Sequence, residues 1–77
     1  MSSLHDPRYR ALINKLRKIR ESKGMTQVEV ASSLKKPQSY IAKVENFERR
    51  LDIIELQDWL VVLDTKISVF LNISFEN

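Results

Sequence analysis

The chain has 77 residues but only one glycine and two prolines. Because these residues interrupt regular structure, their scarcity leaves long stretches that can be helical, and their positions mark where helices end. Asp6 followed by Pro7 is the usual order of a helix N-cap and a first helical residue. Gly24 supplies a C-terminal stop. We therefore predict a first helix from residue 7 to residue 22 or 23.

The apolar face of this first helix contains a charge. At about 100° per residue, Arg20 falls inside the arc, between Leu16 and Ile13. A charged side chain on a buried face needs a partner, because desolvating an unpaired charge is costly. The remaining members of the face are Tyr9, Leu12 and Ile19.

A short second helix is predicted to start at Thr26 and to stop near Lys35. Thr26 and Glu29 have the spacing of a capping box, in which each side chain satisfies a backbone donor of the other residue. The inward face of this helix comprises Val30, Ala31 and Leu34.

The third helix starts at Pro37 or Gln38 and has two different faces. Ile41 and Val44 form an inward arc with Tyr40 and Glu45, so we predict that Glu45 pairs with Arg20. The opposite arc is small and polar, and it comprises Gln38, Ser39, Ala42, Lys43 and Asn46.

Asp52, with Glu55 three positions later, predicts the start of a fourth helix over residues 53 to 63. This helix is apolar on most of its circumference, which indicates burial on more than one side. In so small a domain, one of those sides is expected to meet another chain. Trp59 and Leu63 are the residues predicted to make this contact.

The C-terminal residues follow a different pattern, with apolar and other residues alternating from residue 66 to 76. A period of two, rich in β-branched and aromatic types, predicts a strand with one buried face. The chain offers no second strand, so its pairing partner would be a second copy of the chain. The alternative is a disordered or merely extended tail. The predicted interface residues here are Ile67, Val69, Leu71 and Ile73.

Composition excludes several classes of protein. The chain has no cysteine and one histidine, so no disulfide and no metal site is predicted. It has no glycine-rich loop and no convergent carboxylate pair, so we expect neither an enzyme nor a cofactor. No apolar run reaches membrane-spanning length, and no signal peptide is recognisable, which predicts a cytoplasmic protein.

Charge is distributed unevenly along the chain. Residues 1–43 carry +7 and residues 44–77 carry −4, within a net charge of +3. A basic half of this kind can meet a polyanion. A solubilising basic surface is the simpler alternative.

A short capped helix, a turn, and a helix with a small polar face together form a helix-turn-helix. The second helix of such a motif enters the major groove of DNA. Gln and Asn amides there can pair with adenine, while lysines contact phosphates. A generic helical hairpin with a solvated face would have the same periodicity.

Residues 16–46, LRKIRESKGMTQVEVASSLKKPQSYIAKVEN, carry a more specific signal. The run R-x-x-x-G-x-T-Q, with Ala31, Leu34, Ile41 and Glu45 in register, resembles the Cro/phage-repressor type of helix-turn-helix, also called the xenobiotic-response-element family. The resemblance implies four or five short helices and sequence-specific DNA binding. It implies a phosphate contact for Gln27, base contacts for Gln38 and Ser39, and a buried ion pair of Arg20 with Glu45.

Two residues depart from the family pattern. Lys35 and Phe47 stand where the family usually has glycine. Glycine adopts positive φ at low cost, whereas lysine and phenylalanine do not. We therefore expect these two helix ends to differ in turn geometry.

These observations predict a mainly all-α fold of four to five short helices, with a C-terminal strand that pairs between subunits. Residues 1–64 would form the DNA-binding domain and residues 65–77 the dimerisation strand. The expected function is a homodimeric transcriptional regulator, in particular a repressor, that reads an inverted repeat in double-stranded DNA through residues 37–46. The alternatives are an antitoxin with a toxin partner and a protein-interaction module of the same fold. The predicted DNA-binding residues are Gln27, Lys36, Gln38, Ser39, Tyr40, Lys43 and Asn46.

Overall fold

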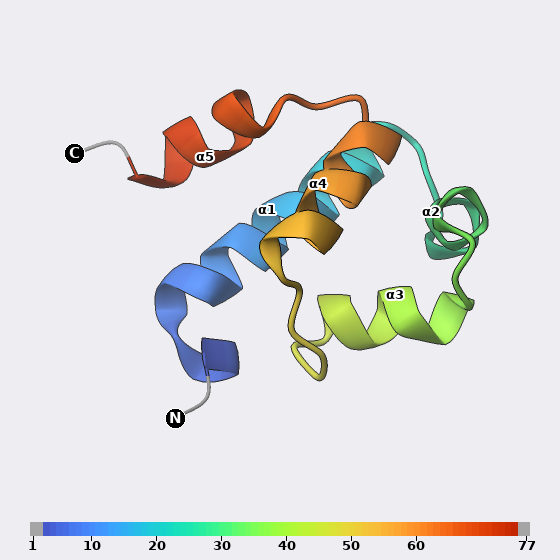
Figure 1. The fold of residues 1–77 in the computed structure, drawn as a ribbon, viewed down its shortest axis with the longest axis horizontal. Coiled ribbons are helices and arrows are strands. Elements are labelled where there is room, and N and C mark those ends of the chain that lie inside the picture. The colour runs from blue at the N-terminus through green and yellow to red at the C-terminus, as the bar shows by residue number, and fades with distance from the viewer. Residues whose placement is uncertain (1–2, 76–77) are drawn as a thin grey trace.

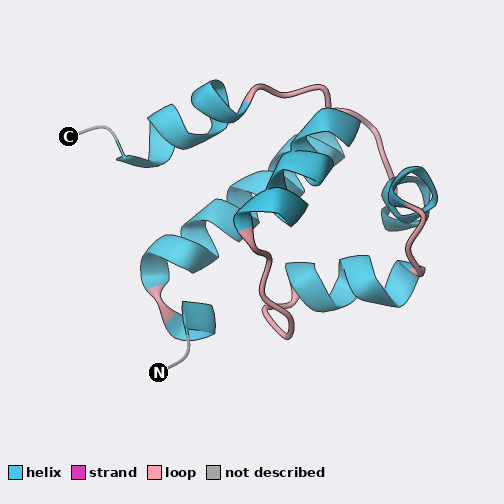
Figure 2. Ribbon diagram, in the orientation of Figure 1, coloured by secondary structure: helices cyan, strands magenta, loops and turns pink. Residues whose placement is uncertain are grey.

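The computed structural model describes residues 3–75, and the side chains of residues 4–71. Within these limits the regular secondary structure is all helical, with no strand (Figure 2). A short 3-10 helix, Ser3–His5, precedes the α-helices. The α-helices are α1 Pro7–Ser22, α2 Gln27–Leu34, α3 Gln38–Glu45, α4 Ile53–Val62 and α5 Ile67–Phe75.

The helices are arranged around α1 and α4 (Figure 1). In this view α2 and α3 lie on the right, α5 lies at the upper left, and α1 and α4 lie between them. α2 packs against α3 and α4, while α1 contacts α3 and α5. The helix-turn-helix pair and the C-terminal helix therefore occupy opposite ends of the domain.

The predicted caps are present. Asp6 accepts a hydrogen bond from the Arg8 backbone N–H at 2.8 Å, and the Arg8 guanidinium lowers the pKa of this carboxyl to about 2. Both predicted capping boxes form, between Thr26 and Glu29 and between Asp52 and Glu55. The starts of α1, α2 and α4 are thus fixed by local chemistry that is readable in the sequence.

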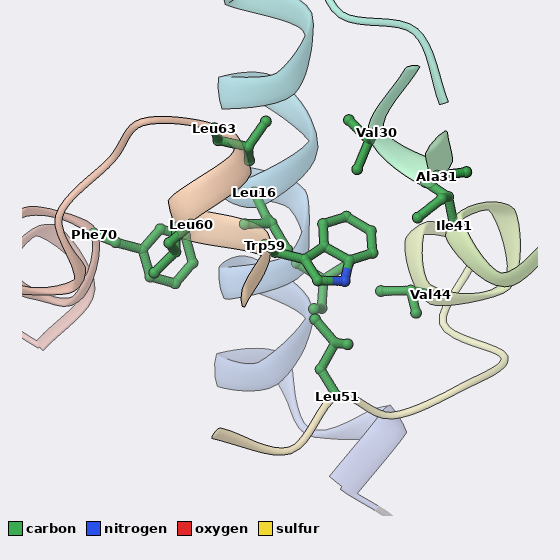
Figure 3. Close-up of a cluster of buried hydrophobic side chains, with 11 residues drawn as sticks. Leu16, Val30, Ala31, Ile41, Val44, Leu51, Trp59, Leu60, Leu63 and Phe70 are labelled. Atoms are coloured by element: carbon green, nitrogen blue, oxygen red, sulfur yellow. The ribbon is translucent and has the colours of Figure 1, made fainter. Parts of the chain in front are cut away.

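Trp59 of α4 lies at the centre of the core (Figure 3). Its indole Nε1 donates a hydrogen bond to the Tyr40 hydroxyl at 3.2 Å, so its polar group is not left unpaired. All five α-helices contribute buried side chains to the cluster around it. The cluster comprises Ile13, Leu16, Val30, Ala31, Ile41, Val44, Leu51, Leu60, Leu63 and Phe70.

The predicted C-terminal strand is wrong, because residues 67–75 form α5. The segment satisfies two periods at once. Ile67, Phe70 and Leu71 have the i, i+3, i+4 spacing of a helix face, and all three pack on the core. A strand would have placed Phe70 on the opposite face from Ile67, whereas it is fully buried here. A helix also satisfies its backbone groups internally, without a second strand.

The predicted dimer contacts need a matching correction. Trp59 and Leu63 are 1% and 0% exposed within the chain's own core, so they are not available to another subunit. Ile67 and Leu71 are half-buried against the same core, while Val69 remains 55% exposed. The side chain of Ile73 lies outside the described residues.

The expected change of turn geometry is also wrong. Lys35 adopts φ 58° and Phe47 φ 62°, so both take the left-handed conformation in which the family has glycine. Asp64, after α4, does the same with φ 53°. The Arg10 guanidinium lies 4.5 Å from the centre of the Phe47 ring, and this contact helps to hold the strained residue.

Adjacent residues on α5 provide a test of its helical docking. We expect Phe70→Ala to lower the free energy of unfolding by about 3–5 kcal/mol, because it empties a core position. Val69→Ala should change it by less than about 0.5 kcal/mol, because Val69 is exposed. Urea denaturation followed by circular dichroism measures both values. A larger loss for Val69→Ala than for Phe70→Ala would instead support the strand register.

Candidate nucleic-acid interface

The turn between α2 and α3 is built by Lys35 and Pro37. Left-handed Lys35 ends α2, and the Lys36 backbone N–H returns to the Ala31 carbonyl at 2.9 Å. Pro37 is the N-cap of α3 and makes no side-chain cap hydrogen bond. The first turn of α3, which begins at Gln38, is therefore free of a capping side chain.

The two faces of α3 are those expected from helical angles. Ile41, Val44 and Glu45 are buried. The residues predicted to face outward are exposed, apart from the half-buried Ala42; they are Gln38, Ser39, Lys43 and Asn46. The sequence-predicted reading residues thus share one surface.

The predicted ion pair of Arg20 and Glu45 is present and buried. The guanidinium donates from Nε to Glu45 Oε2 at 2.7 Å and from Nη2 to Oε1 at 3.0 Å. Its Nη1 donates to the Met25 carbonyl at 2.7 Å. Arg20 is 8% exposed and Glu45 3% exposed, so the pair is shielded from water and both charges are hydrogen-bonded. This pair attaches α3 to α1.

Gln27 connects the ion pair to the surface of α3. Its Nε2 donates to Glu45 Oε1 at 2.9 Å, and its Oε1 accepts from Gln38 Nε2 at 2.7 Å. The family resemblance implied only a phosphate contact for Gln27. The structure adds a position between a buried carboxylate and a residue predicted to read bases.

Tyr40, which was predicted to contact DNA, is half-buried, and its ring faces inward. Its ring centre lies 6.1 Å from that of Trp59, and burial raises the pKa of its phenol above the usual value. The Lys36 ammonium and the Arg49 guanidinium lie 5.4 Å and 4.8 Å from its ring centre. Tyr40 therefore positions two cations beside α3.

Arg49 was not among the predicted site residues. Its two Nη atoms donate to Glu55 at 3.2 Å and 2.9 Å, and this hydrogen bonding lowers the pKa of the Glu55 carboxyl. The same contact raises the pKa of Arg49. Its position could not be read from the sequence, because it depends on how the α3–α4 loop returns over Tyr40.

The chemistry of this surface is that of recognition. It offers amide and hydroxyl groups flanked by cations, which match base edges and phosphates respectively. Among the described residues, no group of acidic and histidine side chains could hold a metal ion. No helix in the described part is long and apolar enough to cross a membrane.

The ion pair predicts a non-additive pattern of stability. Arg20→Met or Glu45→Met alone should cost about 3–5 kcal/mol, because each leaves the opposite charge buried without a partner. The double variant should recover most of this loss, since two apolar side chains of similar length can pack together. Chemical denaturation of the four proteins in this mutant cycle measures the coupling. Additive losses in the double variant would contradict the assignment.

Comparison with known proteins agrees with this geometry. A family model described as Helix-turn-helix matches residues 16–75. A solved structure, described as an XRE-family like protein from Pseudomonas syringae pv. tomato, is 40% identical and has a TM-score of 0.87. The alignment covers 94% of this chain and 88% of that one. A search of curated proteins gave no match. The chain belongs to the XRE-type helix-turn-helix family of DNA-binding proteins.

Proposed function

We propose that this protein is a sequence-specific transcriptional regulator that inserts α3 into the major groove of DNA. The observation that carries the proposal is the pair of exposed polar residues, Gln38 and Ser39, at the start of α3. The N-terminal residues of a recognition helix are those that reach base edges. Gln38 is also held by Gln27, which reduces the conformational entropy lost on binding.

Cations around α3 support binding to the DNA backbone. Lys43 is exposed on the outward face of α3, while Lys36 and Arg49 lie over the Tyr40 ring. Such side chains contact phosphates and provide affinity that depends on salt but not on sequence. Base contacts from α3 would then supply the specificity.

We further propose that the protein binds an inverted repeat as a homodimer and represses transcription by covering the site. A groove of about 510 Å³ between α4 and α5 offers a surface for the second subunit. Val61 on its wall is 74% exposed, which is unusual for a large apolar side chain. Asp64 and Lys66 line the same groove, and within the described part of the chain neither makes an ion pair. Across a two-fold axis they could pair reciprocally.

Selection from random DNA duplexes at moderate salt tests the main proposal. We expect enrichment of an inverted repeat whose half-sites are about 34 Å apart, one turn of the double helix. Gln38→Ala should then lose about 1–3 kcal/mol of binding at the preferred base, and less at other bases. Lys43→Ala should weaken binding to all sequences. It should also reduce the slope of the logarithm of the binding constant against the logarithm of the salt concentration by about one.

A different outcome would identify a different activity. Binding that depends on salt but enriches no sequence would contradict sequence-specific recognition. Absence of DNA binding, with the fold intact, would favour a protein-interaction module.

The groove gives a separate prediction for assembly. Val61→Glu should shift the protein to a monomer, because it places a charge where apolar surface would be buried on dimerisation. Its operator affinity should fall, while its unfolding midpoint should change little, because Val61 is already exposed. Analytical ultracentrifugation measures the mass, and Ile54→Glu, at a residue outside the groove wall and 62% exposed, is the matched control. A dimer that persists in Val61→Glu would exclude this surface.

A further inference from the structure

The hydrogen bonds that link Arg20 to Gln38 converge on Glu45, which accepts from Arg20 on one side and from Gln27 on the other. Arg20 can only donate, and a carboxylate paired with it can only accept. Glu45 therefore accepts two hydrogen bonds from Arg20 and one from Gln27. The direction of the first link is fixed by chemistry and not by the choice of amide rotamer.

That direction is passed along both glutamines. Since the Nε2 of Gln27 must face Glu45, its Oε1 faces Gln38. Gln38 must then turn its own Nε2 toward Gln27, at 2.7 Å. A reversed Gln38 would place two carbonyl oxygens against each other. The buried charge thus sets which end of the exposed amide points outward.

The groups left on Gln38 match one base. Within the described residues, its Oε1 and its second N–H have no protein partner. One acceptor beside one donor is complementary to adenine, which offers an N6 donor and an N7 acceptor in the major groove. Guanine offers two acceptors there and would require both N–H groups of Gln38, one of which is committed to Gln27.

We propose that Glu45 is a positioning residue for base recognition, which fixes the donor–acceptor polarity of Gln38 through Gln27 and so selects adenine over guanine. This proposal rests on the function proposed above, in that α3 must meet base edges. It goes beyond the stabilising role of the ion pair, because it assigns that pair an effect on base preference. Glu45 acts without touching the DNA.

A measurement on the protein without DNA tests whether the Gln38 amide donates to Gln27 or accepts from it. Scalar coupling across the hydrogen bond should connect Gln38 Nε2 with the side-chain carbonyl carbon of Gln27. The reverse coupling, from Gln27 Nε2 to the carbonyl carbon of Gln38, would overturn the proposal. Two amide groups that show neither coupling and exchange freely with water would also overturn it. This experiment needs no DNA, so its result is independent of the proposed function.

Selection with a Gln27→Met variant tests the effect on recognition. The wild-type protein should prefer adenine over guanine about tenfold or more at one position of each half-site. In Gln27→Met both N–H groups of Gln38 are free. The preference for adenine over guanine at this position should therefore fall to about threefold or less, while the other positions keep their preferences. Asn14→Met, which replaces an exposed amide on α1, is the matched control and should leave the ratio unchanged.

The double variant Arg20→Met/Glu45→Met separates Glu45 from Gln27. It keeps both glutamines and removes the Glu45 carboxylate that accepts from Gln27, together with its ion-pair partner, so the same loss of adenine preference is expected. A uniform loss of affinity in Gln27→Met, with base preference intact, would show that Gln27 is a phosphate contact only and would overturn the proposal. Retention of the adenine preference in the folded double variant would also overturn it. A wild-type protein that enriches no sequence would instead refute the proposed function.

Discussion

The buried ion pair of Arg20 and Glu45 is the interaction on which the rest of this structure depends. Transferring two charges from water into a core is costly, and the cost is offset only when the geometry is good and every polar group is satisfied. Here two parallel hydrogen bonds and the Met25 carbonyl meet that condition. The pair joins α1 to α3 and leaves little freedom for α3 to rotate about its axis. Rotation of α3 would change which side chains it presents, so the orientation of the reading surface is set from inside the core.

Much of this arrangement could be predicted from the sequence, because it follows from local rules. The caps at Asp6, Thr26 and Asp52 depend on neighbours within a few residues, and all three are present. The pairing of Arg20 with Glu45 follows from helical angles, since each was the charged member of an apolar face. A pairing over this sequence distance is predictable when only one buried partner of opposite charge exists.

The C-terminal segment could not be assigned in the same way, because its sequence fits a helix and a strand equally well. Short apolar runs carry no decisive period. The core decides between them, since Phe70 fills a buried position that no local rule describes. The strand pairing that was expected to join two subunits does not form in a helix, while Val69 of α5 stays exposed. Within the site, the contacts of Gln27 and Arg49 were missed for a related reason. They require the relative placement of α2, α3 and the following loop, which is a tertiary property.

The left-handed conformation of Lys35 affects both the stability of the fold and the rate at which the protein meets DNA. Lys35 holds a backbone conformation that costs an ordinary residue about 1–2 kcal/mol. Glycine would relieve this strain but would remove a positive charge three residues before Gln38, the first residue of α3. Electrostatic attraction raises the rate at which a protein meets a polyanion. Relative to glycine, lysine at this turn is therefore expected to lower the free energy of unfolding slightly and to raise the rate of encounter with DNA.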